Sequence, residues 1–278
     1  MTGGCTIGAK IIGNRYLLFK NRDLVYEDYK DQCIFEDDIF AVIGIKIGAG
    51  IDMGASIGVN RWGLAACNST VLINSEEAYD VLMERLLRSA KTLDEAYDIV
   101  VNSLDGGDRY QWGNFVIATP DEVGAIEIGD GVYEIERGSD SIARANHHLI
   151  LSTRDALLRA SPEEREAGGP LTASQSRRQI AARMLESARS TQDIIEILST
   201  HAQGKGYDSI CRHRTGVRGE DPWLGETSYS YIIEVETKPL GFRIHVAPGN
   251  PCSTTYHEVQ LDFKTSSEVK GQLIRDFP

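Results

Sequence analysis

The chain has 278 residues, of which 41% are hydrophobic and 25% charged, so it can bury a substantial core and is the size of one large domain. Its formal net charge is −12 and it has no basic stripe. Nucleic-acid affinity depends on clustered Lys and Arg. We therefore expect a single soluble domain with no nucleic-acid partner and no membrane association.

Five scattered cysteines, an odd number, include no Cys-x-x-Cys pair. This pattern argues against a disulfide framework and against a zinc site, so we expect reduced thiols in a cytoplasmic protein, with no cofactor and no metal. The start shows no charged segment followed by an apolar run, and no stretch of about 18 apolar residues occurs, so neither a secretory signal nor a membrane span is expected.

The first predicted element is a hairpin that begins at Cys5. Strand-like residues flank Gly13-Asn14, which suits a two-residue turn. In that register Cys5 faces Arg22, with Cβ atoms roughly 5 Å apart. Asp23 is thereby carried close to the cysteine as well. A cation there would favour the thiolate, and a carboxylate could bind an ammonium group.

Cys5 stands where removal of Met1 to Gly4 would leave a cysteine at the chain start. An N-terminal cysteine carries its own base, an α-amine of pKa about 7.7–8.0, beside a thiol of pKa about 8.5. We therefore predict a propeptide of residues 1–4, cleavage between Gly4 and Cys5, and a single mature domain of residues 5–278. A surface hairpin with a polar end is the alternative interpretation.

The remaining predicted elements run as strands, then helices, then strands. In chain order they are strands at 40–47 and 55–68, a helix from Ser75 to about Ala90, a helix opened by Thr92 that ends before Gly106, a strand meander over 115–136, a helix from Thr172 to about Ala188, a short helix from Asp193, and a closing hairpin of 229–235 with 242–246. A loop is expected over 161–170. Two sheets flanked by helices fit an α+β class, within which several folds remain open.

Two competing motifs can be weighed on sequence. Gly54-Ala55-Ser56-Ile57-Gly58 matches the nucleophile elbow of serine hydrolases, but that motif needs a following helix, and 59–69 reads as a turn and a strand. His147-His148 and His213 suggest a metal. Adjacent side chains on a strand point to opposite faces, and no H-E-x-x-H helix occurs, so we expect no metal site.

Several short runs, taken together in order and spacing, resemble one enzyme family. They are Cys5-Thr6, Lys20-Asn21-Arg22-Asp23, 58–64 leading to Asn68, Ala145-Asn146-His147-His148, 209–213, 227–230, and Gly249-Asn250-Pro251-Cys252. The chain resembles the cysteine branch of the N-terminal nucleophile (Ntn) hydrolases, specifically the acyl-CoA:6-aminopenicillanic acid acyltransferase (isopenicillin N acyltransferase) family. Choloylglycine hydrolase and penicillin V acylase are more distant relatives. The resemblance implies a four-layer αββα sandwich, with two antiparallel sheets between helices, and a precursor that cleaves itself.

Position by position, the resemblance implies Cys5 as the nucleophile, Asp23 as the group that holds its amine, and Asn146 as the oxyanion donor. Asn68 falls where choloylglycine-type relatives place a second polar group near that oxyanion.

One departure concerns the cation. Those relatives have an Arg-Asn-X-Asp run, whereas here Lys20 takes the arginine's place and Arg22 directly precedes the aspartate, so either could flank the thiol. His213 is interpreted as a support or pocket residue, and Tyr229 and Trp223 as candidates for the substrate pocket.

These features predict a self-processing cysteine amidohydrolase or acyltransferase, a zymogen that acts on a linear amide or an acyl thioester such as an acyl-CoA through an acyl-Cys5 intermediate. Water as acceptor gives hydrolysis and an amine gives acyl transfer, and the sequence leaves both open. A homo-oligomer also remains open. The alternatives are an α/β-hydrolase-like serine esterase that uses Ser56 and a non-catalytic binding protein that keeps the sandwich fold.

Overall fold

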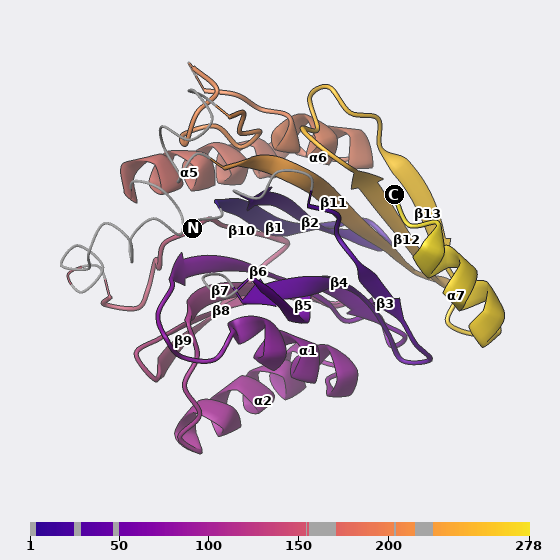
Figure 1. Ribbon diagram of the computed structural model, residues 1–278, viewed down its shortest axis with the longest axis horizontal. Helices are drawn as coiled ribbons and strands as arrows, with labels where there is room; N and C mark the ends of the chain where they lie inside the picture. Colours follow the sequence, from indigo (N-terminus) through magenta and orange to yellow (C-terminus); the bar gives the residue numbers. More distant parts are fainter. Residues whose placement is uncertain are drawn as a thin grey trace.

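The computed structural model describes residues 4–24, 29–46, 50–153, 155, 171–202, 204–214 and 225–278. They form two antiparallel sheets stacked face to face, with helices on both outer faces, which is a four-layer αββα sandwich (Figure 1).

The first sheet has six strands in the order β10-β1-β2-β11-β12-β13. Their bounds are β1 Cys5–Ile12, β2 Arg15–Leu24, β10 Ser141–Arg144, β11 Glu226–Thr237, β12 Leu240–Ala247 and β13 His257–Leu261. Strands from both ends of the chain therefore lie side by side, and β1 is enclosed between β10 and β2.

The second sheet has seven strands that follow one another in chain order. Their bounds are β3 Cys33–Phe35, β4 Ile39–Lys46, β5 Ile51–Asn60, β6 Ala65–Leu72, β7 Trp112–Ala118, β8 Val123–Gly129 and β9 Val132–Gly138. Apolar side chains from the facing surfaces of the two sheets form the central core.

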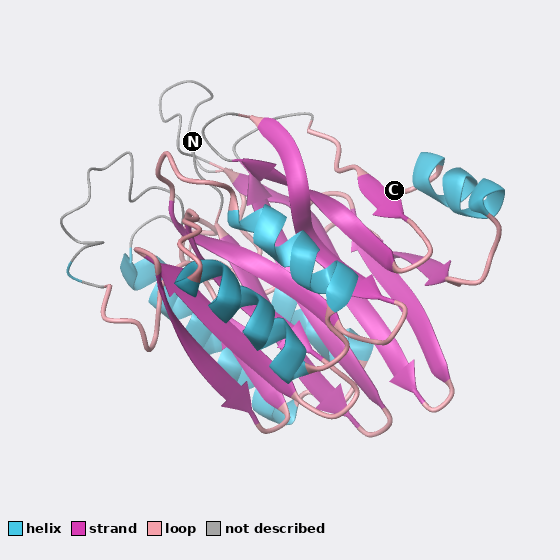
Figure 2. Ribbon diagram, turned by 90° about the horizontal axis from the view of Figure 1, so that it is seen from below, coloured by secondary structure: helices cyan, strands magenta, loops and turns pink. Residues whose placement is uncertain are grey.

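Two helices cover each sheet. Helices α1 (Tyr79–Ser89) and α2 (Leu93–Asp105) pack on the seven-stranded sheet, across which Figure 2 shows them lying. Helices α5 (Leu171–Ser187) and α6 (Thr191–Leu198) pack on the six-stranded sheet. None of the described helices is long and apolar enough to cross a membrane.

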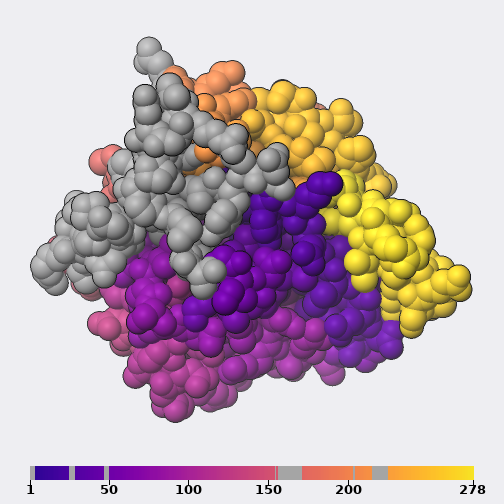
Figure 3. All heavy atoms as spheres, viewed as in Figure 1, coloured from indigo at the N-terminus to yellow at the C-terminus, as the bar shows by residue number. Residues whose placement is uncertain are grey.

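A fifth described helix, α7 (Ser267–Arg275), follows β13 and contacts the edge strand β3. Lys270 Nζ donates to Asp37 Oδ1 at 2.6 Å and ties the helix to that edge. Figure 3 shows this C-terminal segment, in yellow, at one end of the molecule beside the indigo and violet of the N-terminal third.

The predicted N-terminal hairpin is confirmed in its register, because Ile12 pairs with Arg15 and Cys5 pairs with Arg22. The meander, the hairpin of β11 and β12, the helix after Thr92 and a helix over 171–187 are also confirmed, the last beginning one residue before Thr172. Thr92 caps α2 through its side chain, which accepts from the Glu95 backbone amide at 3.2 Å.

Two boundary predictions are wrong. Helix α1 begins at Tyr79 and not at Ser75, and its N-cap Ala78 makes no side-chain cap. The first turn of α1 packs closely on β5: a Cβ at Gly54 would lie 2.2 Å from the Asp80 backbone carbon, so only glycine permits this approach. The β11–β12 hairpin does not close the fold, because β13 and α7 follow it. The loop expected at 161–170 lies outside the described residues.

Candidate active site

Cys5 begins β1, with its side chain 6% exposed and turned into the core between the two sheets. A cavity of about 20 Å³ adjoins it, room for about one water molecule. The lining combines the end of β2 with groups from β4, β5, β6 and α1. These residues are Cys5, Lys20, Arg22, Asp23, Leu24, Ile45, Ser56, Asn68, Thr70, Tyr79 and Asp80.

Lys20 is the cation that most favours the Cys5 thiolate. Burial raises the pKa of the thiol, and the Lys20 charge opposes that effect more strongly than the Arg22 charge does. Lys20 Nζ is fixed by donation to Ser56 Oγ at 2.6 Å and to Asn68 Oδ1 at 2.8 Å. Arg22 faces Cys5 in the ladder, but its guanidinium forms a buried ion pair with Asp31. The structure thus distinguishes two cations that the sequence could not.

The Asp23 carboxylate is buried against the peptide that precedes Cys5. Its Oδ1 accepts from Thr227 Oγ1 at 2.8 Å, whereas its Oδ2 has no hydrogen-bond partner within the described part of the chain. A Cβ on Gly4 would come within 2.9 Å of that Oδ2. Burial raises the pKa of Asp23 from 3.8 to about 6, although the charges of Arg212 and Arg177 oppose the rise.

The peptide between Gly4 and Cys5 is held from two sides. The Gly4 carbonyl accepts from the backbone N–H of Asp23 at 2.9 Å, and the Cys5 amide donates to Asn146 Oδ1 at 2.9 Å. The Asp23 N–H also interacts with the Cys5 thiol and helps to lower its pKa. One backbone donor therefore serves both the sulfur and the carbonyl beside it.

Asn146 follows β10 and points its side chain at the start of β1. Its Oδ1 accepts from the Cys5 amide and from Arg177 Nη2, each at 2.9 Å, and its Nδ2 donates to the Thr70 carbonyl at 2.7 Å. Arg177 Nη1 in turn donates to the Cys5 carbonyl at 3.0 Å. An amide nitrogen has two hydrogens, so Nδ2 keeps a second one beyond its bond to Thr70.

Asn68 lines the cavity, but its side chain is occupied. Its Nδ2 donates to the Ala55 carbonyl at 2.9 Å and to Asp80 Oδ1 at 3.1 Å, while its Oδ1 accepts from Lys20. Both amide hydrogens are therefore used inside the protein. In this arrangement Asn68 positions Lys20 and does not present a donor to the cavity.

Three other sequence-predicted residues lie away from this cavity or outside the description. The Tyr229 ring stacks on Tyr231 with 5.7 Å between centroids and packs in the central core. His213 lies in a separate cluster with His201, Cys211 and Cys252. Trp223 falls outside the described residues.

Ser56 does not sit on a nucleophile elbow. It lies within β5, and the next element is strand β6 with no helix between them. The serine-esterase alternative therefore lacks the strand–turn–helix geometry that it requires. Ser56 Oγ instead accepts from Lys20 Nζ.

Sequence reasoning missed Asp80, Arg177 and Arg212. Asp80 is buried beside Asn68, and burial raises its pKa to about 6 against the opposing charge of Lys20. A signal for Arg177 was present, because it interrupts the small and apolar positions Ala173, Ala181 and Leu185 at four-residue spacing on α5, all of them buried. A charge within such a stripe must find buried partners.

No family model and no curated protein matches this sequence. Solved structures do match its fold. A variant of conjugated bile acid hydrolase from Clostridium perfringens aligns with a TM-score of 0.56 and 10% identity, over 94% of this chain and 98% of its own. A second mutant of that hydrolase gives a TM-score of 0.53 and 9% identity over the same shares.

Penicillin V acylase from Agrobacterium tumefaciens aligns with a TM-score of 0.53 and 14% identity, over 95% of this chain and 88% of its own. At these identities the likeness concerns the fold, so the expected αββα sandwich of the Ntn hydrolases is confirmed.

Proposed function

We propose that the chain is a self-processing cysteine amidohydrolase or acyltransferase. It would remove residues 1–4 from its own start and then act through an acyl-Cys5 thioester. The observation that carries this proposal is the buried Asp23 Oδ2, which lacks a hydrogen-bond partner among the described residues and lies against Gly4, next to the nitrogen that cleavage would turn into an amine. The solved structures of similar fold include enzymes named for hydrolysis of conjugated bile acids and for acylase activity on penicillin V.

The processing step follows from the contacts of the Gly4–Cys5 peptide. Cys5 Sγ attacks the Gly4 carbonyl carbon, and the negative charge that develops on the Gly4 oxygen faces the Asp23 N–H that already donates to it. The C–N bond breaks as the thiol proton passes to the departing nitrogen, which leaves Gly4 on sulfur as a thioester. That cleavage frees the α-amine of Cys5. Water then hydrolyses the thioester, which releases residues 1–4 with a carboxylate at Gly4 and restores the Cys5 thiol.

After cleavage the new ammonium group gains acceptors that are already in place. Asn146 Oδ1 accepts from the Cys5 nitrogen in the uncut chain and can continue to do so. Asp23 Oδ2 is the second acceptor, and loss of Gly4 removes the backbone that now lies against it. The cavity beside the uncut Cys5 holds only about one water molecule, which is too small for an acyl group. Removal of the leader would supply the missing space.

In turnover, the neutral form of the α-amine takes the thiol proton and becomes the ammonium, and the thiolate attacks the acyl carbon of a linear amide or an acyl thioester. The second hydrogen on Asn146 Nδ2 is the proposed donor to the oxyanion. Lys20 supports the thiolate from within the cavity, held by Ser56 and Asn68. Water as acceptor gives hydrolysis, and an amine gives acyl transfer.

Intact mass spectrometry tests the processing half of the proposal. The unmutated chain should lose Met1 to Gly4, and Cys5→Ala should keep them. Cys33→Ala is the matched control, since Cys33 is another buried free cysteine and does not line the cavity. A Cys5→Ala chain that loses the same four residues would contradict self-cleavage by Cys5.

Acid-quenched mass spectrometry with N-acyl amides and acyl thioesters tests the second half. The processed chain should carry an acyl group on Cys5 during turnover. A processed chain that neither forms this adduct nor releases product with either class would favour the non-catalytic binding role.

A further inference from the structure

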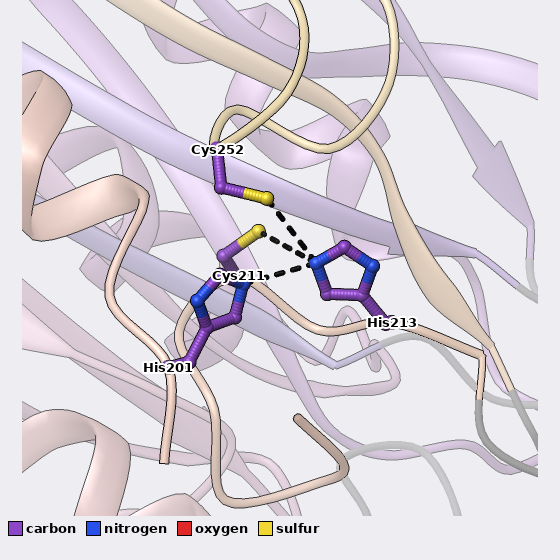
Figure 4. A group of neighbouring side chains, drawn as sticks. All are labelled: His201, Cys211, His213 and Cys252. Atoms are coloured by element: carbon purple, nitrogen blue, oxygen red, sulfur yellow. Dashed lines mark hydrogen bonds between the residues drawn. The ribbon is translucent and has the colours of Figure 1, made fainter. Parts of the chain in front are cut away.

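We propose that His201, Cys211, His213 and Cys252 form a zinc site, separate from the Cys5 cavity. The ligand atoms of these residues all lie within 4.8 Å of one another. Figure 4 shows both sulfurs and both imidazole rings converging on one point, with His213 Nε2 in contact with the other three side chains. The sequence singled out His213 but gave no metal-site spacing, because His201 and Cys252 come from segments on either side of the Cys211–His213 pair. The site proposed here departs from the expectation of no metal.

The distances fit one tetrahedral ion. Zinc bonds of about 2.0–2.1 Å to nitrogen and about 2.3 Å to sulfur place tetrahedral ligand atoms about 3.3–3.8 Å apart. The His201 and His213 Nε2 atoms lie 2.9 Å apart, and His213 Nε2 lies 3.7 Å from Cys211 Sγ and 3.2 Å from Cys252 Sγ. Since no two ligand atoms lie more than 4.8 Å apart, side-chain shifts of up to about 1 Å would seat an ion between them.

The donor set selects the metal. Two thiolates and two neutral imidazoles neutralise a divalent ion, and a tetrahedral S₂N₂ set is typical of structural zinc. Four protein ligands leave no open position, so the ion would bind and not catalyse. Binding would release the two thiol protons to solvent.

The ion would join three segments that hydrogen bonds already hold side by side, among them Cys211 N–H to the Thr200 carbonyl and Asn250 Nδ2 to the Arg212 carbonyl. His201 follows helix α6, Cys211 and His213 lie in the segment before β11, and Cys252 lies in the turn after β12. Cys211 is buried and Cys252 is exposed, so the ion would lie near the protein surface, where these three segments meet.

Arg212 stands between two of the ligands and reaches the Cys5 region. Its backbone N–H donates to Thr227 Oγ1 at 2.9 Å, and that hydroxyl donates to Asp23 Oδ1 at 2.8 Å. The Arg212 carbonyl accepts from Asn250 Nδ2 at 2.8 Å, two residues before Cys252. The metal would therefore fix the segment that carries this guanidinium towards Asp23.

Metal analysis of the reduced, tag-free full chain tests the site without reference to acyl chemistry. After loading with zinc chloride and dialysis, elemental mass spectrometry should find about one zinc per chain. Cys252→Ala and His201→Ala should lower the retained zinc at least about tenfold, because each removes a ligand. Cys33→Ala and His257→Ala, outside the cluster, should retain zinc as the parent does.

Cobalt(II) added to the unmutated chain gives a readout that does not depend on how the variants fold. The expected signature is the visible absorption of tetrahedral cobalt with a thiolate charge-transfer band, both abolished by zinc. A reduced parent chain that retains no zinc, or ligand variants with undiminished zinc, would overturn the proposal. A reduced chain that binds neither zinc nor cobalt but forms a Cys211–Cys252 disulfide on mild oxidation would also overturn the proposal. That result would assign the two cysteines to redox chemistry.

Discussion

Asp23→Asn should stabilise the uncut chain while it impairs acyl chemistry. The Asp23 side chain is 1% exposed, and burial raises its pKa from 3.8 to about 6. Each pKa unit corresponds to about 1.4 kcal/mol, so the ionised carboxylate destabilises the uncut fold by about 3 kcal/mol. A neutral amide of the same shape removes that penalty.

The effect has a defined pH window. Below pH 3.8 the carboxyl is neutral in both the folded and the unfolded chain, so the parent and the Asp23→Asn chain should be equally stable. As pH rises above 3.8, Asp23 ionises in the unfolded chain but stays neutral in the folded one, so the stability of the parent chain falls. The fall ends once pH has passed the folded pKa of about 6. The advantage of the amide should be about half developed at pH 5 and complete, at about 3 kcal/mol, by pH 8.

Urea unfolding at several pH values, followed by tryptophan fluorescence, measures this difference. Both chains should carry Cys5→Ala, so that the leader stays attached and no ammonium group forms beside residue 23. A gain of about 3 kcal/mol moves the urea midpoint by about 1 M or more at pH 8. Asp98→Asn, at an exposed position on α2, is the control and should show no such pH-dependent gain.

The opposite sign at pH 8 would refute the reasoning. If Asp23→Asn were less stable there, attraction between the carboxylate and the guanidiniums of Arg212 and Arg177 would outweigh the burial of the charge. A gain of equal size at every pH would also refute it, because the cause could not be the ionisation of Asp23.

Three further outcomes are expected. Asn146→Ala should lower kcat by about 10²–10³ with a smaller change in KM, as for loss of one oxyanion donor, and Asn146→Asp should be at least as harmful; steady-state kinetics that show kcat unchanged would place the oxyanion donor elsewhere. Lys20→Met should raise the pKa of the thiol and move the rising limb of the pH–rate profile to higher pH. Arg22→Met should mainly lower the free energy of unfolding, by about 3–5 kcal/mol, because it leaves buried Asp31 unpaired. The reverse pattern would make Arg22 the cation beside the thiol. Gly4→Ala should slow the loss of residues 1–4 in a time course of intact mass, since its Cβ would crowd Asp23 Oδ2 at 2.9 Å, and unchanged processing would show that the leader can shift at no cost.

Local sequence determined the elements whose signals are local. The two-residue turn at Gly13-Asn14 fixes the register of β1 and β2, because alternate side chains must face the core, and it therefore placed Arg22 opposite Cys5 before any tertiary contact was known. Capping by Thr92 set the start of α2 in the same way. Where packing contributes, the sequence was a poorer guide, as at α1, which lacks a side-chain cap and packs its first turn against Gly54 of another strand.

Some features of the candidate site could likewise be predicted from the sequence, and others required the tertiary structure. The hairpin register carried Asp23 close to Cys5, whereas Asn146 was selected only through the family resemblance. The structure brings Asn146 to the Cys5 amide. Only the tertiary structure shows that Arg22 forms an ion pair with Asp31 and that Asn68 Oδ1 accepts a hydrogen bond from Lys20. These outcomes depend on which side chains meet across the two sheets.

The four-ligand cluster shows the limit of sequence most clearly. His201 and Cys252 are brought together by the return of β11 and β12 to the six-stranded sheet, and no spacing rule covers ligands carried by such distant segments. A strand register is set by neighbours in the chain, whereas a site built across layers is set by the packing of the whole fold.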